Sequence, residues 1–262
     1  MISNFSFAGR HCLHDFACEF FENSRQMGPD TIRSAYQVAG RSGSILYPGR
    51  EVYEDFSRSG ELIQRGPQRL EMEDLIWQQS VAAWLLCGKE RLIFDRHPDR
   101  YYWAQVDKGL TFGYKAWMFG SIAVEFLVQP FAYALQRTTR SLTMTDKNAI
   151  ARVPVDTGIR TPLDVTIVNS GTAALQGVTV VAGKRQIVLA GMNVGSGKSV
   201  VVNLSGERVE VKVGEEDARR YVQSLQLLEI DAATDVSVQL ATGYGTISAH
   251  VTLSARGRWV YG

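Results

Sequence analysis

The second half of the chain alternates between polar and apolar residues over several short runs. The clearest run, TISAHVTLSA from Thr246 to Ala255, has an apolar side chain at every second position. Arg208–Val213 and Asp235–Leu240 repeat the pattern. A period of two is that of a β-strand with one buried face and one solvent-exposed face. This half of the chain is therefore predicted to consist of strands.

Clusters of turn-forming residues separate these runs, and each cluster contains glycine. They are Asn169–Thr172, Gly191–Gly197, Ser205–Gly206 and Gly243–Gly245. Short strands that are punctuated in this way favour an antiparallel β-sandwich. Because such a sandwich buries its own inner faces, we expect a fragment of about residues 145–262 to fold alone as a monomer.

The first half contains one persuasive helix, from Glu71 to Leu86. Acidic residues occupy its first turn, where the helix dipole is positive, and Gly88 suits its end. Its apolar residues at helical spacing are Trp77, Val81, Trp84 and Leu85. The strand-like runs of this half are Ser34–Tyr47 (two strands around Gly40–Gly43), Arg91–Asp95, Tyr101–Val106 and Ser121–Phe131.

Composition limits the class of protein. The 262 residues suffice for two modest domains, and 28 basic against 27 acidic residues give no case for a dedicated nucleic-acid binder. The polar, patternless segment 136–150 predicts a boundary between domains 1–137 and 138–262. Three cysteines are too few for a disulfide scaffold and are predicted to be free thiols in a reducing cytoplasm.

Neither a secretory signal nor a membrane span is predicted. The N-terminus lacks a basic start followed by an apolar run. The most apolar stretch, Phe119–Leu135, is interrupted by Glu125, Gln129 and Pro130. A membrane-spanning helix would need about 20 predominantly apolar residues.

The Gly195–Ser199 stretch, GSGKS, is similar to the end of a phosphate-binding P-loop. That motif needs a glycine five positions before Gly197, but Met192 stands there. A β-branched run follows the stretch, where a P-loop needs a helix. We therefore predict a glycine-rich hairpin between Gln186–Ala190 and Ser199–Leu204, and no nucleotide site.

Histidines, carboxylates and nucleophiles give no catalytic or metal constellation. If His11 and His14 lie on a strand, residues three apart point to opposite faces and cannot share a metal ion. His97 and His250 are lone residues. No serine lies in a G-x-S-x-G elbow, and no cysteine lies in a recognisable motif. We predict no catalytic residue, no metal and no cofactor, and expect the chain not to be an enzyme.

Two weaker site hypotheses remain near residue 100. Asp95 and Asp99 flank a turn, where solvated turn residues are a better explanation than an acid–base pair. Arg96, Arg100 and Tyr101–Trp103 are able to form a basic-aromatic patch, but core and interface roles fit these aromatic residues better at balanced charge.

Short segments in a particular order run through nearly the whole chain. They are Phe7–Arg10, Val38–Ser44, the helix end Trp84–Leu86, Leu92–Asp95, Tyr101–Val106, Glu125–Tyr133, Val168–Thr172 and Arg256–Trp259. This series resembles the distal tail protein (Dit) family of phages with long non-contractile tails and of related prophages. The chain departs from the family at Ser42 and Gln129, where an acidic residue is common.

The resemblance implies a mainly β protein without activity or cofactor. Residues 1–137 would be a β-sandwich or barrel-like domain with one α-helix. This domain would form a homohexameric ring, or two such rings would pair as a dimer of hexamers. Residues 138–262 would be a galectin-like antiparallel β-sandwich. The hexamer would be a baseplate hub at the virion tail tip, assembled in the host bacterial cytoplasm. Its partners would be the tail tube protein and the tail-associated, tail-fibre or receptor-binding proteins.

Composition adds one argument for the hexamer. The first 118 residues hold four of the five tryptophans and many phenylalanines, a set that we expect to exceed what one core can bury. The phenylalanines are Phe5, Phe7, Phe16, Phe20 and Phe21. The alternative function is a saccharide-binding or adhesion module for host cell-wall glycans, for which the available aromatic residues are Tyr221, Tyr244, Trp259 and Tyr261.

Overall fold

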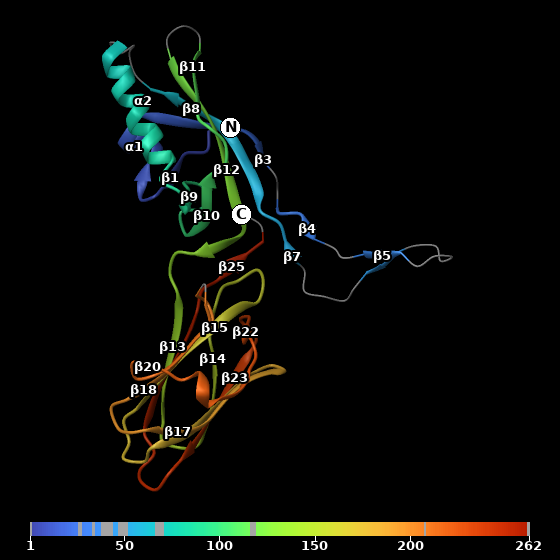
Figure 1. Cartoon of the computed structure of the whole chain (residues 1–262), viewed down its shortest axis with the longest axis vertical. Coiled ribbons are helices and arrows are strands. Elements are labelled where there is room, and N and C mark those ends of the chain that lie inside the picture. Colours follow the sequence, from blue (N-terminus) through green and yellow to red (C-terminus); the bar gives the residue numbers. More distant parts are fainter. Residues whose placement is uncertain are drawn as a thin grey trace. The chain divides into compact units, whose positions relative to one another are not determined.

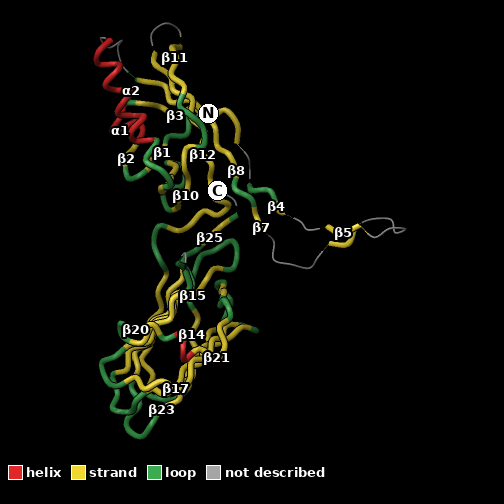
Figure 2. The backbone as a smooth tube through the Cα atoms, in the orientation of Figure 1, coloured by secondary structure: helices red, strands yellow, loops and turns green. Residues whose placement is uncertain are grey.

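The chain divides into two compact units, shown in Figures 1 and 2. The computed structural model describes residues 2–25, 28–32, 35–37, 44–46, 52–65, 71–115, 119–206 and 208–260. Unit 1 is Met1–Tyr133 with Trp259–Gly262, and unit 2 is Ala134–Arg258. Both units consist mainly of antiparallel strands, so the predicted fold class is confirmed. The functional division into 1–137 and 138–262 stays a prediction.

Unit 1 is built on one curled sheet with the strand order β2-β1-β9-β10-β12-β8-β3, and β11 and β25 also pair with β12. The strands are β1 (Phe5–Phe7), β2 (Arg10–His11), β3 (Cys18–Arg25), β8 (Phe56–Gln64), β9 (Glu90–Phe94), β10 (Arg100–Val106), β11 (Thr111–Lys115), β12 (Phe119–Ala134) and β25 (Arg258–Trp259). The sheet curls until β3 meets the chain ahead of β1, where Ile2 bridges to Phe21. This near-closure is barrel-like, as predicted.

Aromatic side chains fill the inside of this curled sheet. Phe5 is fully buried, and its ring centroid lies 5.1 Å from that of Phe20 and 5.3 Å from that of Phe126. Helix α2 (Glu71–Leu85) covers this core with Trp77 and Trp84. The predicted helix is therefore confirmed, and its apolar spacing reflects packing.

The aromatic residues that were predicted to exceed the core mostly lie within it. Phe5, Phe7, Phe16 and Phe20 are each at most 5% exposed, and Phe21 is half-buried. The sheet curls around the phenylalanines, and α2 adds two tryptophans from above. The compositional argument for an interface is therefore wrong for these residues. Trp117 lies outside the described residues.

Unit 1 also contains a second helix, α1 (Cys12–Phe16), where one helix was predicted. The backbone N–H groups of Leu13 and His14 donate to the side chain of His11, and Ala17 ends the helix with a φ of 53°. Five residues give no measurable helical period, so the sequence pattern did not reveal this element.

Two short pairs of strands complete the description of unit 1. They are β4 (Thr31–Ile32) with β7 (Val52–Tyr53), and β5 (Ala35–Gln37) with β6 (Ser44–Leu46). The β5–β6 pair confirms the two strands predicted for Ser34–Tyr47. The glycine-containing segment between them, residues 38–43, lies outside the described residues.

Unit 2 is a sandwich of two antiparallel sheets. The first has the order β13-β24-β15-β18-β19-β20, with β22 also paired to β15, and the second has the order β14-β23-β16-β17-β21. The strands are β13 (Thr138–Met144), β14 (Asn148–Arg152), β15 (Thr161–Asn169), β16 (Leu175–Ala182), β17 (Arg185–Val194), β18 (Ser199–Asn203), β19 (Glu210–Val213), β20 (Glu216–Asp217), β21 (Val222–Leu225), β22 (Glu229–Ile230), β23 (Asp235–Thr242) and β24 (Ala249–Ala255). A 3-10 turn, Arg219–Tyr221, precedes β21.

Alternating side chains fill the space between the two sheets, as the sequence predicts. Along β24, Ala249, Val251, Leu253 and Ala255 are all fully buried, whereas Ile247, ahead of the strand, is half-buried. The sandwich expected from the period of two is therefore confirmed. Its predicted likeness to galectins stays a prediction.

The segment 136–150, which the sequence analysis described as patternless, contains β13 and most of β14. Among the described strands both lie at sheet edges, where β13 pairs with β24 and β14 with β23. Most β13 side chains are therefore solvent-exposed, which removes the alternation on which a strand prediction depends.

Candidate functional site

The Gly195–Ser199 stretch forms a turn that crosses from one sheet of the sandwich to the other. Lys198 N donates to the Gly195 carbonyl at 3.2 Å, and Gly197 has a φ of 78°, a left-handed value that suits glycine. The predicted hairpin is wrong, because β17 pairs with β16 and β21 whereas β18 pairs with β15 and β19. A strand follows the turn, as predicted, so no helix N-terminus is present to hold phosphate.

The buried Asn169 fixes this crossing. Its Nδ2 donates to the carbonyls of Ala173 and Val194, both at 2.9 Å, and its Oδ1 accepts from Gly171 N at 3.1 Å. The Asn169 carbonyl also accepts from Gly197 N at 2.7 Å. The turn segments Asn169–Thr172 and Gly191–Gly197 thus meet at the side chain of Asn169, and both have a structural role.

His11 and His14 lie side by side, which corrects the prediction that they point apart. The prediction assumed a strand, but His14 lies in α1 and His11 caps it, so their ring centroids are 4.4 Å apart. His11 Nδ1 accepts from Leu13 N and His14 N at 3.1 and 3.2 Å, and its Nε2 lies 3.0 Å from Asp95 Oδ1. Both nitrogens of His11 are therefore committed to structural contacts. The described residues include no group of three or more metal-binding side chains.

The two aspartates near residue 100 have different partners. Asp95 pairs with His11, and Asp99 accepts from Arg100 Nε at 3.2 Å. His97 N donates to the Phe94 carbonyl at 2.9 Å, which closes the turn between β9 and β10. This pairing fits the turn interpretation better than an acid–base pair. His250 is exposed on β24.

The Tyr101–Trp103 run divides between the two faces of the sheet. Tyr102 enters the core, whereas Tyr101 and Trp103 point to the outside. The Tyr101 ring stacks on that of Tyr133 at 5.6 Å, and Arg91 lies over Tyr101 at 4.9 Å and over Trp103 at 5.7 Å. We call Tyr101, Trp103, Tyr133 and Arg91 the outer aromatic cluster. It is the part of unit 1 that best fits a contact surface, since Trp, Tyr and Arg dominate binding energies at interfaces.

The predicted basic residues contribute differently from what the sequence suggests. Arg100 lies over the Trp259 ring at 3.8 Å, and Arg96 turns toward Phe94 and Glu22. Arg91 replaces them in the outer aromatic cluster, where it faces Trp103 across the β9–β10 pair. The sequence analysis did not single out Arg91; the alternation of this polar residue with apolar Leu92 is the signal that could have indicated its outward position.

A groove of about 580 Å³ lies between α1 and α2. Its lining includes Arg10, His14, Phe16, Ile76, Trp77 and Ser80. Arg10 lies over the Phe16 ring at 4.3 Å, and Ile76 is 60% exposed beside Leu75, which is 54% exposed. The α2 side of the groove therefore offers apolar surface to a neighbouring molecule, whereas on the α1 side Arg10 covers the buried Phe16.

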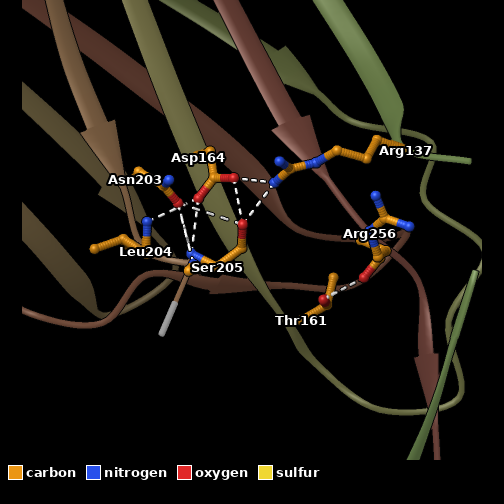
Figure 3. Close-up of polar contacts among 8 residues, drawn as sticks. Arg137, Thr161, Asp164, Asn203, Leu204, Ser205 and Arg256 are labelled. Atoms are coloured by element: carbon orange, nitrogen blue, oxygen red, sulfur yellow. Dashed lines mark hydrogen bonds and ion pairs between the residues drawn. The ribbon is translucent and has the colours of Figure 1, made fainter. Parts of the chain in front are cut away.

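A polar network in unit 2 surrounds Asp164 (Figure 3). Asp164 Oδ1 accepts from the backbone nitrogens of Leu204 and Ser205 at 2.7 and 2.9 Å. Its Oδ2 accepts from Ser205 Oγ at 2.6 Å and from Arg137. With four donors on one carboxylate, Asp164 is a fixed acceptor and not a free base.

The same network anchors the first residues of unit 2. Arg137 precedes β13 and is held by Asp164 (Figure 3). Arg256 Nη1 donates to the carbonyls of Ala134 and Leu135 at 2.7 and 2.9 Å. Thr161 Oγ1 in turn donates to the Arg256 carbonyl at 2.5 Å. The arrangement joins the start of the unit to β15 and to the end of β24, and we assign it a structural role.

The cysteine thiols do not form a reactive site in the structure. Cys12 and Cys18 are buried, and Cys87 is exposed. Burial raises the pKa of Cys12 to about 11, which keeps this thiol protonated at neutral pH. Burial also raises the pKa of Cys87, and the charge of Glu90 adds to the effect.

The aromatic residues available for glycan binding are dispersed. Tyr244 is fully exposed, Tyr221 lies under Arg220 at 4.8 Å, and Trp259 belongs to unit 1. Tyr261 lies outside the described residues. Among the described helices, none has the length and apolar character needed to cross a bilayer.

Comparison with known proteins identifies the fold. No protein-family model and no curated protein matches the chain. Among solved structures, the chain is similar to the SPP1 Dit (gp 19.1) protein, a hub of the adsorption apparatus in phages that infect Gram-positive bacteria, with a TM-score of 0.67 and 13% identity. The match covers 99% of this chain and 100% of that one. The chain has the fold of a phage distal tail protein.

Two baseplate structures of phage P2, in the activated conformation with Ca and with Sr, are more distant. Each matches with a TM-score of 0.50 and 9% identity over the full length of both chains. The predicted resemblance to the Dit family is therefore confirmed at the level of fold. It extends across both units, which agrees with the ordered segments found from one end of the sequence to the other.

Proposed function

We propose that this protein is a structural component of a phage tail tip, the hub that joins the tail tube to the host-recognition apparatus. The observation that carries the proposal is the fold match with SPP1 Dit, which covers 99% of this chain and 100% of that one. At 13% identity the match supports a shared architecture, and the role follows from that architecture by analogy.

The surface of unit 1 supports an assembly role. The outer aromatic cluster presents Trp103 and Tyr133 beside the Arg91 cation on the outside of the curled sheet, while Tyr101, which is buried, packs beneath them. On α2, Leu75 and Ile76 are more than half exposed. Subunits of a cyclic ring contact their neighbours through two different surfaces, and two separate apolar regions satisfy that requirement.

We infer a homohexamer, or two such hexamers back to back, with unit 1 forming the ring. The tail tube protein and the tail-associated or receptor-binding proteins are the proposed partners, at a virion tail tip assembled in the bacterial cytoplasm. The number six rests on the family resemblance, because the residues themselves do not set the symmetry.

Native mass spectrometry of the full chain tests this proposal. We expect a species of six or twelve subunits whose population rises with protein concentration, since ring closure is an association equilibrium. A strictly monomeric protein at concentrations up to about 100 µM, well above the micromolar range of specific assemblies, would contradict self-assembly of the free protein. Mixing with purified tail tube protein then tests whether the hexamer closes on that partner.

A further inference from the structure

Three charged side chains come together at one end of the curled sheet in unit 1. Glu22 lies on β3, Arg58 on β8 and Arg96 in the loop after β9. Arg58 Nη1 donates to Glu22 Oε1 at 2.9 Å, and Arg96 Nη1 donates to Glu22 Oε2 at 3.2 Å. The side chains of Arg58 and Glu22 are only 2% and 5% exposed, while that of Arg96 is 23% exposed and reaches the surface.

The charges of this cluster do not balance. Two guanidinium groups share one carboxylate, so one positive charge is left over in a buried place. Desolvation by burial lowers the pKa of Arg58, and the charge of Glu22 opposes that effect. The Phe94 ring lies 5.0 Å from the Cζ atom of each arginine, which offers cation–π stabilisation but no oxygen acceptor.

Specific donor atoms of the two arginines have no acceptor. Arg96 Nε, Arg96 Nη2 and Arg58 Nε are buried and lack a hydrogen-bond partner in the part of the chain that the structure describes. On a guanidinium group, Nε and Nη2 donate from the same edge as a pair of parallel bonds. That edge matches the two oxygens of a carboxylate, the geometry for which arginine is selected at binding sites.

We propose that the Nε/Nη2 edge of Arg96 is a binding site for a second carboxylate, which completes a network of two arginines and two carboxylates. The ligand is either a small free carboxylate or an acidic side chain of a neighbouring copy of this chain. The second source rests on the proposed function, and the first does not. Because both donor atoms are buried, the carboxylate reaches them when the partly exposed Arg96 side chain turns outward.

A thermal-unfolding titration of the full chain tests the first source. Sodium acetate is compared with sodium chloride at equal ionic strength, which cancels general screening. The wild type should gain melting temperature with acetate in a saturable way. Arg96→Lys keeps the positive charge but lacks the paired donors of the guanidinium group, and Arg96→Met lacks both. Acetate should therefore not raise the melting temperature of either variant.

Arg65 provides the matched control. It pairs with Glu19 of β3 at 2.5 Å, but its side chain is 61% exposed and it lies outside the cluster. Arg65→Lys should therefore respond to acetate as the wild type does. A response that survives in Arg96→Lys would place the anion elsewhere and overturn the proposal for free carboxylates.

Sedimentation of the same proteins tests the second source. If a neighbouring subunit supplies the carboxylate, Arg96→Lys should weaken self-association by about tenfold or more, whereas Arg65→Lys should not. Equal behaviour of Arg96→Lys, Arg96→Met and the wild type in both measurements overturns the inference. If no variant self-associates, the proposed hexamer fails, and the acetate titration alone decides whether the site exists.

Discussion

Trp84 Nε1 donates to the backbone carbonyl of Phe7 at 2.7 Å, across 77 residues of sequence. The same indole stacks on Phe16 with ring centroids 4.3 Å apart and on Phe5 at 5.7 Å. One side chain of α2 thus contacts both β1 and the residue that ends α1. Trp84 therefore links the helices to the sheet of unit 1.

Replacing Trp84 should destabilise unit 1 in two steps of different size. Trp84→Phe retains an aromatic ring but loses the donor, and we expect a loss of about 1–3 kcal/mol in the free energy of unfolding. Trp84→Ala also leaves a cavity and should cost about 3–5 kcal/mol. Urea unfolding measures both. Trp103→Phe, on the outer face, is the control and should change stability by less than about 1 kcal/mol.

The stability of unit 1 should fall at alkaline pH because of Cys12. Burial raises the pKa of its thiol to about 11, from an ordinary value of 9.0. Between these values the unfolded chain releases the proton while the folded chain keeps it, so stability that is complete below pH 9 is lost as pH rises toward 11. The loss is about 2–3 kcal/mol at most.

Cys12→Ala separates this contribution from general alkaline unfolding. The variant lowers stability at neutral pH through the lost contacts of the sulfur, but its additional loss between pH 9 and pH 11 should be smaller than that of the wild type. Parallel pH profiles of the two proteins would show that Cys12 does not control the alkaline limb. Cys87→Ala, at an exposed thiol, serves as the comparison.

Unit 2 should fold alone when the fragment begins at residue 134. Such a fragment, 134–258, retains β13, which pairs with β24 at seven positions, and the contact of Arg137 with Asp164. A fragment that begins at residue 145, as the sequence suggests, lacks both and exposes the edge of β24. We expect cooperative thermal unfolding of the longer fragment by circular dichroism, and a lower midpoint or aggregation of the shorter one.

Glycan binding by unit 2 would have to depend on Tyr244, the fully exposed ring among the candidates. Saccharide sites stack sugar faces on exposed aromatic rings, and Tyr221 is partly covered by Arg220. We expect fragment 134–258 and its Tyr244→Ala variant to be retained equally little on bacterial wall polysaccharide. Retention that this substitution abolishes would favour the adhesion alternative.

How well the sequence predicted each element depended on how local its determinants are. The strand β24 and the helix α2 were predicted because apolar residues recur along each segment, with a period of two in β24 and of 3.6 in α2. The crossing between β17 and β18 was not, because a glycine-rich turn is the same whether the next strand joins the same sheet or the opposite one. The cluster of Glu22, Arg58 and Arg96 draws on three distant segments, and no local pattern links them.

The exposed face of α2 provides the sharpest test of the proposed hexamer. Leu75 and Ile76 on α2 are 54% and 60% exposed, and Leu86, directly after the helix, is 58% exposed. If this face contacts a neighbouring subunit, Leu75→Gln with Ile76→Gln should weaken self-association by about tenfold or more and leave the melting temperature of the dissociated protein nearly unchanged. Ile150→Gln is the matched control, since Ile150 is 74% exposed but lies in unit 2, outside the proposed ring-forming part. Sedimentation velocity over a range of concentrations measures the effect. Equal weakening by both variants would mean that general surface hydrophobicity drives association, and an unchanged assembly in the α2 variant would place the subunit contact on another surface, with the outer aromatic cluster as the next to be tested.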